Sequence, residues 1–307
     1  MRRLLLAGLL FEAAIGIGNA SAETNTTYFL IASKAKAIDS PILQRRGITA
    51  ATKVSEAANR IFPDVKLQLL IEPETTPQKI RTGNAKENVT KKKFYDHLLD
   101  LTTSVQADDT VFIYTHTHGQ RTRAAPSELK TCGGIVLSLP VNDPITRGVF
   151  PWEEYAKLVL KIPARNVIVL TMACFSGELI DTLNEQRMKD MWKDRKSQGR
   201  NFVVLTSQNS TKLSSPIGIG DQIINPFTYA LITALKKDSY TSTSNQHIES
   251  NDRKNKQSHS DAKITIGEFI DHILITTKET PSNIRQYKNT AEPQVEGSYN
   301  RSDVLID

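Results

Sequence analysis

Two histidines and one distant cysteine are the residues of this chain whose types and spacing are suited to chemistry. His116 and His118 end the apolar run VFIYTHTHG (111–119), and Cys174 follows the apolar run NVIVLTMA (166–173). One possibility is a metal site, because residues i and i+2 of a strand point to the same face and imidazoles are common zinc ligands. The other is a thiol nucleophile whose proton is moved by an imidazole.

The residues after the histidines disfavour a metal site. In the metal-binding pattern H-x-H-x-D-H, the aspartate position falls on Gln120 and the last histidine position on Arg121, whose charge would repel a cation. The other histidines lie on predicted helices or in a polar segment, without a ligand spacing; they are His97, His247, His259 and His272. We therefore predict that the protein uses no metal and no other cofactor.

His118 and Cys174 are better placed to act together. Open α/β sheets carry their chemistry at the carboxyl ends of strands, and these residues follow two different apolar strands. A free thiol has a pKa of about 8.5 and is mostly protonated at neutral pH, so a nearby imidazole would activate it. The backbone N–H groups of Gly119 and Cys174 are candidate donors to an oxyanion. A helix predicted to begin near Gly177 would favour the thiolate through its N-terminus.

The elements that position these residues follow from the hydrophobic pattern. Short apolar runs alternate with amphipathic stretches, and the runs around VFIY and VIVL are apolar throughout, which is typical of strands buried on both faces of a parallel sheet. We predict an α/β fold with an open, mostly parallel sheet flanked by helices on both faces. Predicted strands are 28–33, 65–71, 110–116, 167–173 and 202–207. Predicted helices are 47–62, one capped by Thr90, 152–160, 178–196, 226–237 and 266–277.

The N-terminus and composition predict an exported, globular protein. Residues 1–22 have two arginines, a short apolar stretch and a small-residue cleavage pattern, which is typical of a signal peptide; an anchoring helix is the alternative. We expect residues 23–307 to form a single domain with a mobile polar loop at 238–263, and no stable membrane insertion after cleavage. The location would be secreted, periplasmic or endolysosomal, depending on the host. The formal charge of +6 is scattered, which does not favour nucleic-acid binding.

Several stretches carry a resemblance to a known family. The chain resembles the legumain-like cysteine peptidases, the C13 family of the caspase-like clan, over most of residues 28–235, whereas the C-terminal part matches poorly. The resemblance implies a caspase–hemoglobinase fold, a thiol peptidase activity on protein or peptide substrates, and a catalytic dyad of His118 and Cys174. It leaves His116 as a spectator. The matching stretches are ENVTKKKFYDHLLDL (87–101), DDTVFIYTHTHG (108–119), GGIVLSLP (133–140) and VIVLTMACFSGEL (167–179).

The resemblance also suggests residues of a substrate pocket. In this clan, the residue two before the nucleophile lines the pocket for the side chain preceding the cut, and here it is Met172. Asp221 matches an acidic pocket residue of legumains, and Ser207 and Gln208 would form another wall. The family's supporting asparagine after the first strand is absent, with Ser33 in that region. A pocket with one carboxylate and a methionine would accept asparagine or a basic residue.

Two alternatives remain open at this point. Release of the acyl-enzyme to an amine instead of water would make the protein a transpeptidase of the same fold. A catalytically silent binding module is the second alternative. A disulfide between Cys132 and Cys174, the two cysteines of the chain, would support it by removing the nucleophile.

Overall fold

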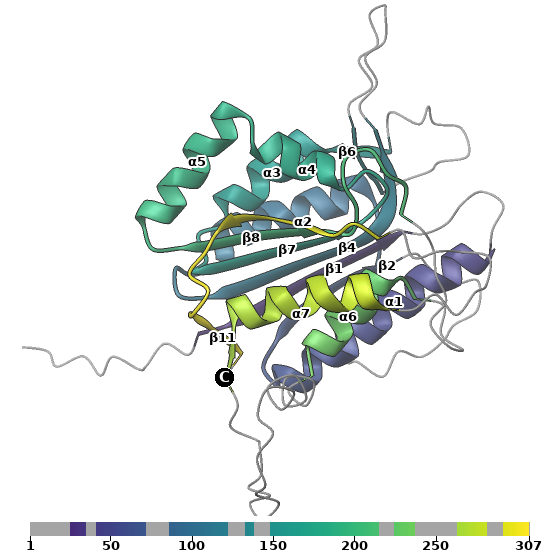
Figure 1. Ribbon diagram of the computed structural model, residues 1–307, viewed down its shortest axis with the longest axis horizontal. Helices are drawn as coiled ribbons and strands as arrows, with labels where there is room; N and C mark the ends of the chain where they lie inside the picture. Colours follow the sequence, from purple (N-terminus) through teal and green to yellow (C-terminus); the bar gives the residue numbers. More distant parts are fainter. Residues whose placement is uncertain are drawn as a thin grey trace, which may run out of the picture.

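The fold is built on an open sheet with helices on either side (Figure 1). It is seen in a computed structural model, which describes residues 25–34, 41–71, 86–121, 133–137, 148–214, 224–236, 263–280 and 291–306. The predicted signal peptide and nearly all of the predicted polar loop lie outside these residues. None of the helices in the described ranges has the length and apolar character needed to cross a membrane.

The central strands are parallel and follow the order β10-β8-β7-β4-β1-β2-β3. β10 alone on this path is antiparallel to its neighbour, β8. After β1 the chain adds β2 and β3 on one side and then returns to add β4 on the other, so the order reverses between β1 and β4, where the carboxyl ends of parallel strands leave room for a site. The strands are β1 (Thr27–Lys34), β2 (Lys66–Ile71), β3 (Lys86–Asn88), β4 (Thr110–Gln120), β7 (Asn166–Met172), β8 (Asn201–Thr206) and β10 (Gln294–Ser298).

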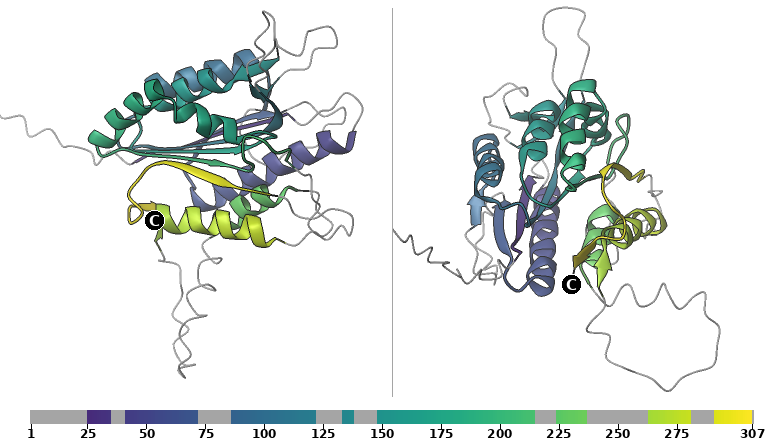
Figure 2. Two further views of the ribbon diagram at one scale, coloured as in Figure 1. Left: turned by 45° about the horizontal axis from the view of Figure 1, so that its top comes forward. Right: turned by 90° about the vertical axis from the view of Figure 1, so that its left-hand side faces the viewer.

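Helices cover both faces of this sheet, which confirms the predicted α/β architecture (Figures 1 and 2). One face carries α1 (Pro41–Ile61), α6 (Pro226–Ala234) and α7 (Ile266–Glu279). The other carries α2 (Lys91–Ser104), α3 (Trp152–Lys161), α4 (Gly177–Leu183) and α5 (Gln186–Ser197). The predicted cap is confirmed as well, because the Thr90 side chain accepts a hydrogen bond from the Lys93 N–H at 3.1 Å.

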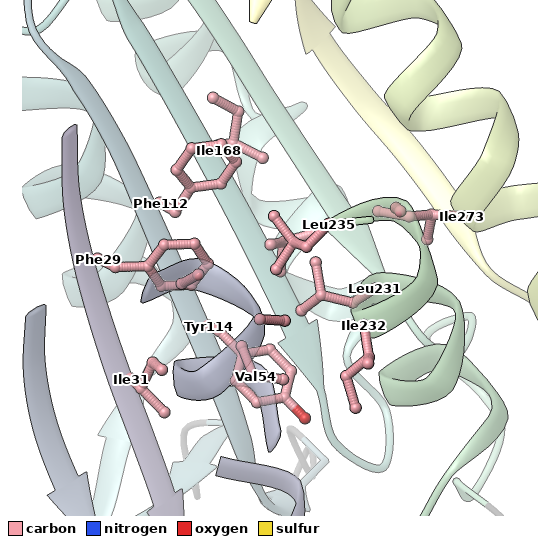
Figure 3. Packing of buried hydrophobic residues seen from close by; sticks show 14 of the residues in the cluster. Phe29, Ile31, Val54, Phe112, Tyr114, Ile168, Leu231, Ile232, Leu235 and Ile273 are labelled. Atoms are coloured by element: carbon pink, nitrogen blue, oxygen red, sulfur yellow. The ribbon is translucent and has the colours of Figure 1, made fainter. Parts of the chain in front are cut away.

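Two apolar layers hold the helices to the sheet. Alternate residues of β4 serve the two layers: Phe112 and Tyr114 pack under α1, α6 and α7 (Figure 3), whereas Val111 and Ile113 pack under α2 and α3. These side chains are all fully buried, and each such burial contributes roughly 1.5–3 kcal/mol to folding. The apolar part of β4, which is buried on both faces, is therefore held between the two helix layers.

Several predicted boundaries were wrong. The helix predicted at 178–196 is two helices, and the break at Asn184 and Glu185 coincides with the Asn184 side chain donating to the Ile180 carbonyl at 3.2 Å, a local bond that competes with the helix. α1 begins six residues before the predicted start, with a proline at its first position. Short strands without a clear periodicity were missed. They include β3, β10, the antiparallel β5 (Gly134–Val136) and β6 (Val149–Pro151), and the separate pair β9 (Ile264–Thr265) and β11 (Val304–Ile306).

A buried hydrogen bond ties β4 to α6 and provides a test of this packing. The Tyr114 and Thr228 hydroxyls are 2.7 Å apart, and both residues are fully buried. Tyr114→Phe is expected to lower the free energy of unfolding by about 1–2 kcal/mol, because the Thr228 hydroxyl loses its partner away from water. Adding Thr228→Val should recover part of this loss. Urea unfolding measures both effects, and a double variant as unstable as the sum of the singles would contradict the pairing.

Candidate active site

The register of β4 and β7 brings the predicted dyad to the same place. His116 pairs with Met172 across these parallel strands. This pair is the last one of the ladder: Cys174 lies in the turn that follows β7, whereas β4 continues through His118 to Gln120 and pairs there with β5. His118 and Cys174 are partly exposed, whereas His116 and Met172 are buried one step below. His118 and Cys174 thus belong to neighbouring segments at the carboxyl edge of the sheet, and their action as a dyad stays a prediction.

The backbones of the two strand ends touch at Gly119. A Cβ placed on Gly119 would lie 1.7 Å from the Cys174 carbonyl oxygen, which no other residue type would allow without displacement. The backbone N–H groups of Gly119 and of Cys174 itself lower the pKa of the Cys174 thiol, against the larger effect of burial. The role of these two N–H groups as oxyanion donors stays a prediction.

The chain leaves β7 through a turn at Cys174–Ser176, in which the residue after Cys174 has a strained backbone. Phe175 has a φ of 56°, and in the described part of the chain it is the one non-glycine residue with a positive φ. For a bulky side chain this conformation costs about 1–3 kcal/mol and is found mostly at functional sites. Its N–H donates to the Lys212 carbonyl at 2.9 Å, which holds the turn. Sequence reasoning missed this strain, since phenylalanine gives no signal for it.

The environment of Cys174 keeps the thiol protonated. Burial raises the pKa of the Cys174 thiol, and hydrogen bonds from the N–H groups of Ser214, Gly119 and Cys174 offset this only in part. α4 begins at Gly177, three residues after Cys174, and stabilisation of the thiolate by its N-terminus stays a prediction. Cys174 is a free cysteine, while Cys132 lies outside the described residues. A base is therefore needed to generate the nucleophile.

His116 has a different environment from His118. It is 6% exposed, lies between Ser33 and Met172 in the sheet register, and its Nδ1 atom has no hydrogen-bond partner within the described ranges. Burial, with a smaller contribution from the neighbouring His118, lowers the pKa of His116 to about 4. His116 is therefore neutral at physiological pH. Within the same ranges, no group of three histidine, cysteine or acidic residues gathers to hold a metal ion.

The three predicted pocket residues in the described part of the chain each form a hydrogen bond with a residue outside the predicted pocket. Met172 is buried, and its sulphur accepts from the Ser214 hydroxyl at 3.8 Å. Ser207 donates to the Ala173 carbonyl at 3.5 Å. The Gln208 side-chain oxygen accepts from the Glu292 N–H at 3.3 Å, so this oxygen faces the C-terminal segment. Asp221 lies outside the described residues.

Ser214 is a site residue that sequence reasoning missed. Its N–H donates to the Cys174 sulphur at 3.3 Å, and its hydroxyl accepts from the Asn225 side chain at 3.2 Å. Asn225 is in turn the N-cap of α6 and accepts from the Phe227 N–H at 2.8 Å. No motif marks Ser214, because its loop reaches the cysteine from 40 residues away in the chain.

Comparisons with known proteins identify no family and no activity for this chain. No family model matches the chain, and no curated protein matches it. Among solved structures, it is similar to the crystal structure of protein GSU0716 from Geobacter sulfurreducens, at 12% sequence identity and a TM-score of 0.47, covering 92% of this chain and 100% of that one. A likeness at this level carries no inference about function.

The buried His116 predicts a pH-dependent stability. Below an unfolded pKa of about 6.5, the unfolded chain binds a proton that folded His116 does not bind until about pH 4. Between these values the free energy of unfolding should decrease as the pH is lowered, by up to about 1.4 kcal/mol for each pH unit, because of this residue. Urea unfolding of the wild type and of His116→Leu measures the difference, which should be constant above pH 7 and change below 6.5. Parallel curves over the whole range would contradict a neutral buried His116.

Proposed function

We propose that this protein is an exported cysteine endopeptidase of the legumain-like type, with Cys174 as nucleophile and His118 as general base and acid. The observation that carries the proposal is the contact at Gly119, where β4, the strand that contains His118, meets the turn that contains Cys174 and the strained Phe175. The proposal is supported further by the free, partly exposed thiol of Cys174, which accepts a hydrogen bond from the Ser214 N–H at 3.3 Å. Covalent acyl transfer needs such a nucleophile together with a base, and His118 is the base that we assign to it.

The reaction would begin from a neutral dyad. His118 takes the thiol proton as Cys174 Sγ attacks the carbonyl carbon of the scissile peptide bond. The oxyanion that forms is held by the N–H groups of Gly119 and Cys174. His118 then gives its proton to the leaving amine as the C–N bond breaks, which leaves a thioester. Water attacks the thioester with His118 again as base, so that the acid product leaves and the thiol is restored.

The same residues suggest how a substrate would be selected. Met172 and Ser214 lie against Cys174, and Ser207 and Gln208 support the floor beneath it. With Asp221 as the acidic residue of the pocket, we propose a preference for asparagine or a basic side chain before the cut. Transfer of the acyl group to an amine, as in a transpeptidase, uses the same dyad and differs only in the second nucleophile.

Loss of the thiol should abolish cleavage. Cys174→Ala is expected to lower kcat/KM on a fluorogenic peptide library by a factor on the order of 10⁴ or more, because no other group can form the acyl-enzyme. The matched control is Cys132→Ser, which removes the other cysteine and should keep activity. Iodoacetamide should inactivate this control and the wild type alike.

Other results would point to the alternatives. Cleavage that survives in Cys174→Ala would contradict the thiol mechanism. Absence of cleavage by the reduced wild type, with or without limited proteolysis, would favour the silent binding module. A product joined to an added amine would instead identify a transpeptidase.

A further inference from the structure

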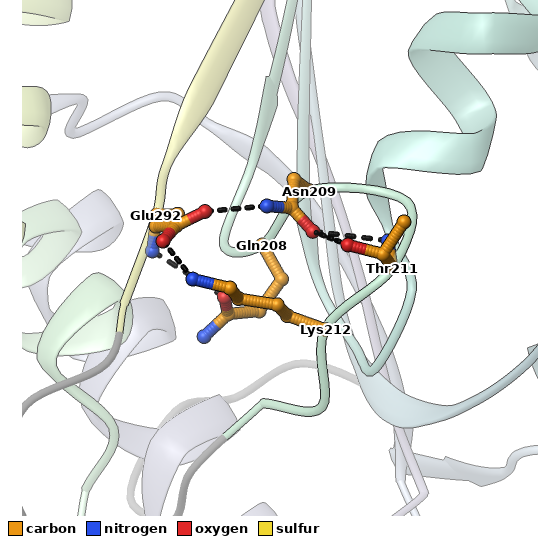
Figure 4. A network of polar contacts seen from close by, with 5 residues as sticks. All are labelled: Gln208, Asn209, Thr211, Lys212 and Glu292. Atoms are coloured by element: carbon orange, nitrogen blue, oxygen red, sulfur yellow. Dashed lines mark hydrogen bonds and ion pairs between the residues drawn. The ribbon is translucent and has the colours of Figure 1, made fainter.

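The C-terminal segment that leads into β10 is tied to the loop 208–214 through a single glutamate. The Glu292 carboxylate forms an ion pair with Lys212 and accepts a hydrogen bond from the Asn209 side chain (Figure 4). The Glu292 N–H donates to the Gln208 side-chain oxygen at 3.3 Å. Three residues of the loop thus converge on one residue from a segment about 80 positions away in the chain.

The loop held by Glu292 is the one that supports the nucleophile. The carbonyl of Lys212 accepts from the N–H of Phe175, the strained residue after Cys174. Further along, the Ser214 N–H donates to the Cys174 sulphur. At the start of the loop, the backbone of Gln208 exchanges hydrogen bonds of 3.2 and 3.3 Å with the Ser176 hydroxyl. Lys212 therefore links the two: its side chain pairs with Glu292, and its carbonyl accepts from the strained Phe175.

Besides these contacts and the hydrogen bonds of Ser214 to Met172 and Asn225, the loop 208–214 has few interactions that fix the path of its middle part. Beyond the end of β8 it forms no strand, and its internal order comes mainly from Asn209, whose side-chain oxygen accepts from the N–H and hydroxyl of Thr211 at 2.9 Å each. Leu213, near the sulphur-binding end, is 65% exposed and contributes little packing. By contrast, Glu292 is anchored, because β10 begins two residues later and pairs with β8 from Gln294 onward.

We propose that Glu292 is a positioning residue for Cys174: by clamping Lys212 and Asn209 it holds the loop 208–214 so that the Ser214 N–H stays on the Cys174 sulphur. The effect on peptide cleavage rests on the proposed function, but the effect on the thiol does not. Glu292 touches neither the sulphur nor a substrate and acts through the loop.

A simpler explanation is that the ion pair between Glu292 and Lys212 only stabilises the fold. The exposure of this pair distinguishes a stabilising role from a positioning role. The side chains of Glu292 and Lys212 are 46% and 45% exposed, and pairs this exposed contribute little to stability because water and salt screen them. A stability role predicts a small loss of folding free energy and an unchanged thiol. A positioning role predicts unchanged folding and a less reactive thiol.

The test measures Cys174 directly, in full-length protein carrying Cys132→Ser so that a single thiol remains. The rate of iodoacetamide alkylation is followed from pH 6 to 10 for the parent and for Glu292→Ala. We expect the rate at pH 7.5 to fall about fivefold and the midpoint of the profile to move to higher pH, because a thiolate that loses one N–H donor is less stable. Urea unfolding should be unchanged within error.

Matched variants identify the interaction. Glu296→Ala is the control, because Glu296 lies four residues along the same segment and its carboxylate contacts Asn184 instead of the loop; alkylation should match the parent. Lys212→Met should slow alkylation in the same direction as Glu292→Ala. The variant with both Lys212→Met and Glu292→Ala should be alkylated no more slowly than Glu292→Ala alone, because both changes remove the same ion pair. Glu292→Gln, which keeps an oxygen for Asn209 but loses the ion pair, should fall between.

The possible outcomes separate this inference from the proposed function. Unchanged alkylation in folded Glu292→Ala, or an equal loss in Glu296→Ala, would overturn the positioning role. If the parent is readily alkylated but cleaves no peptide, the peptidase proposal fails, while slower alkylation in Glu292→Ala still supports the clamp. Where the parent does cleave peptides, Glu292→Ala should lower kcat more than it raises KM, because the change lies at the nucleophile and not in the pocket.

Discussion

The close approach of two backbones at the carboxyl edge of the sheet is the constraint on which the site depends. Gly119 lies against the Cys174 carbonyl, at a distance that a side chain on Gly119 would make impossible. This contact fixes the end of β4 that carries His118 relative to the turn after β7. The long apolar registers of β1, β4 and β7 keep the strands from sliding, since a shift of one residue would turn every buried side chain to the wrong face.

Burial and reactivity act in opposite directions at Cys174. Packing the thiol among Met172, Ser214 and the strand ends raises its pKa, while backbone N–H groups favour the charged form. The balance leaves a protonated thiol that becomes nucleophilic only with a base beside it. His116, two residues before His118 in β4, is buried more completely. Burial lowers the pKa of His116 so far that this residue is uncharged at neutral pH.

The strained turn after β7 is supported by residues from distant segments. Phe175 is held through its N–H by Lys212, Ser176 is held by Gln208, and Gly177 allows the close approach of Ser210, whose N atom would lie 2.4 Å from an added Cβ. Such support offsets the cost of an unfavourable backbone conformation. The C-terminal segment completes the arrangement through Glu292, and so the far end of the chain contributes to the geometry of a turn in its middle.

The sequence by itself determined the α/β class and the five long strands with most of the helices, because continuous apolar runs and their alternation with amphipathic stretches are local properties. It placed Cys174 just after β7 correctly, but it ended β4 at residue 116, whereas β4 continues through His118 to Gln120 by pairing with β5. It also indicated Gly119 as a backbone donor. The strain at Phe175, the contact of Ser214 with the sulphur, the break between α4 and α5, and the clamp at Glu292 were decided by the tertiary structure alone. Each of these arises from contacts between residues far apart in the chain, or from a backbone conformation that the residue itself disfavours, and neither leaves a periodic signal in the sequence.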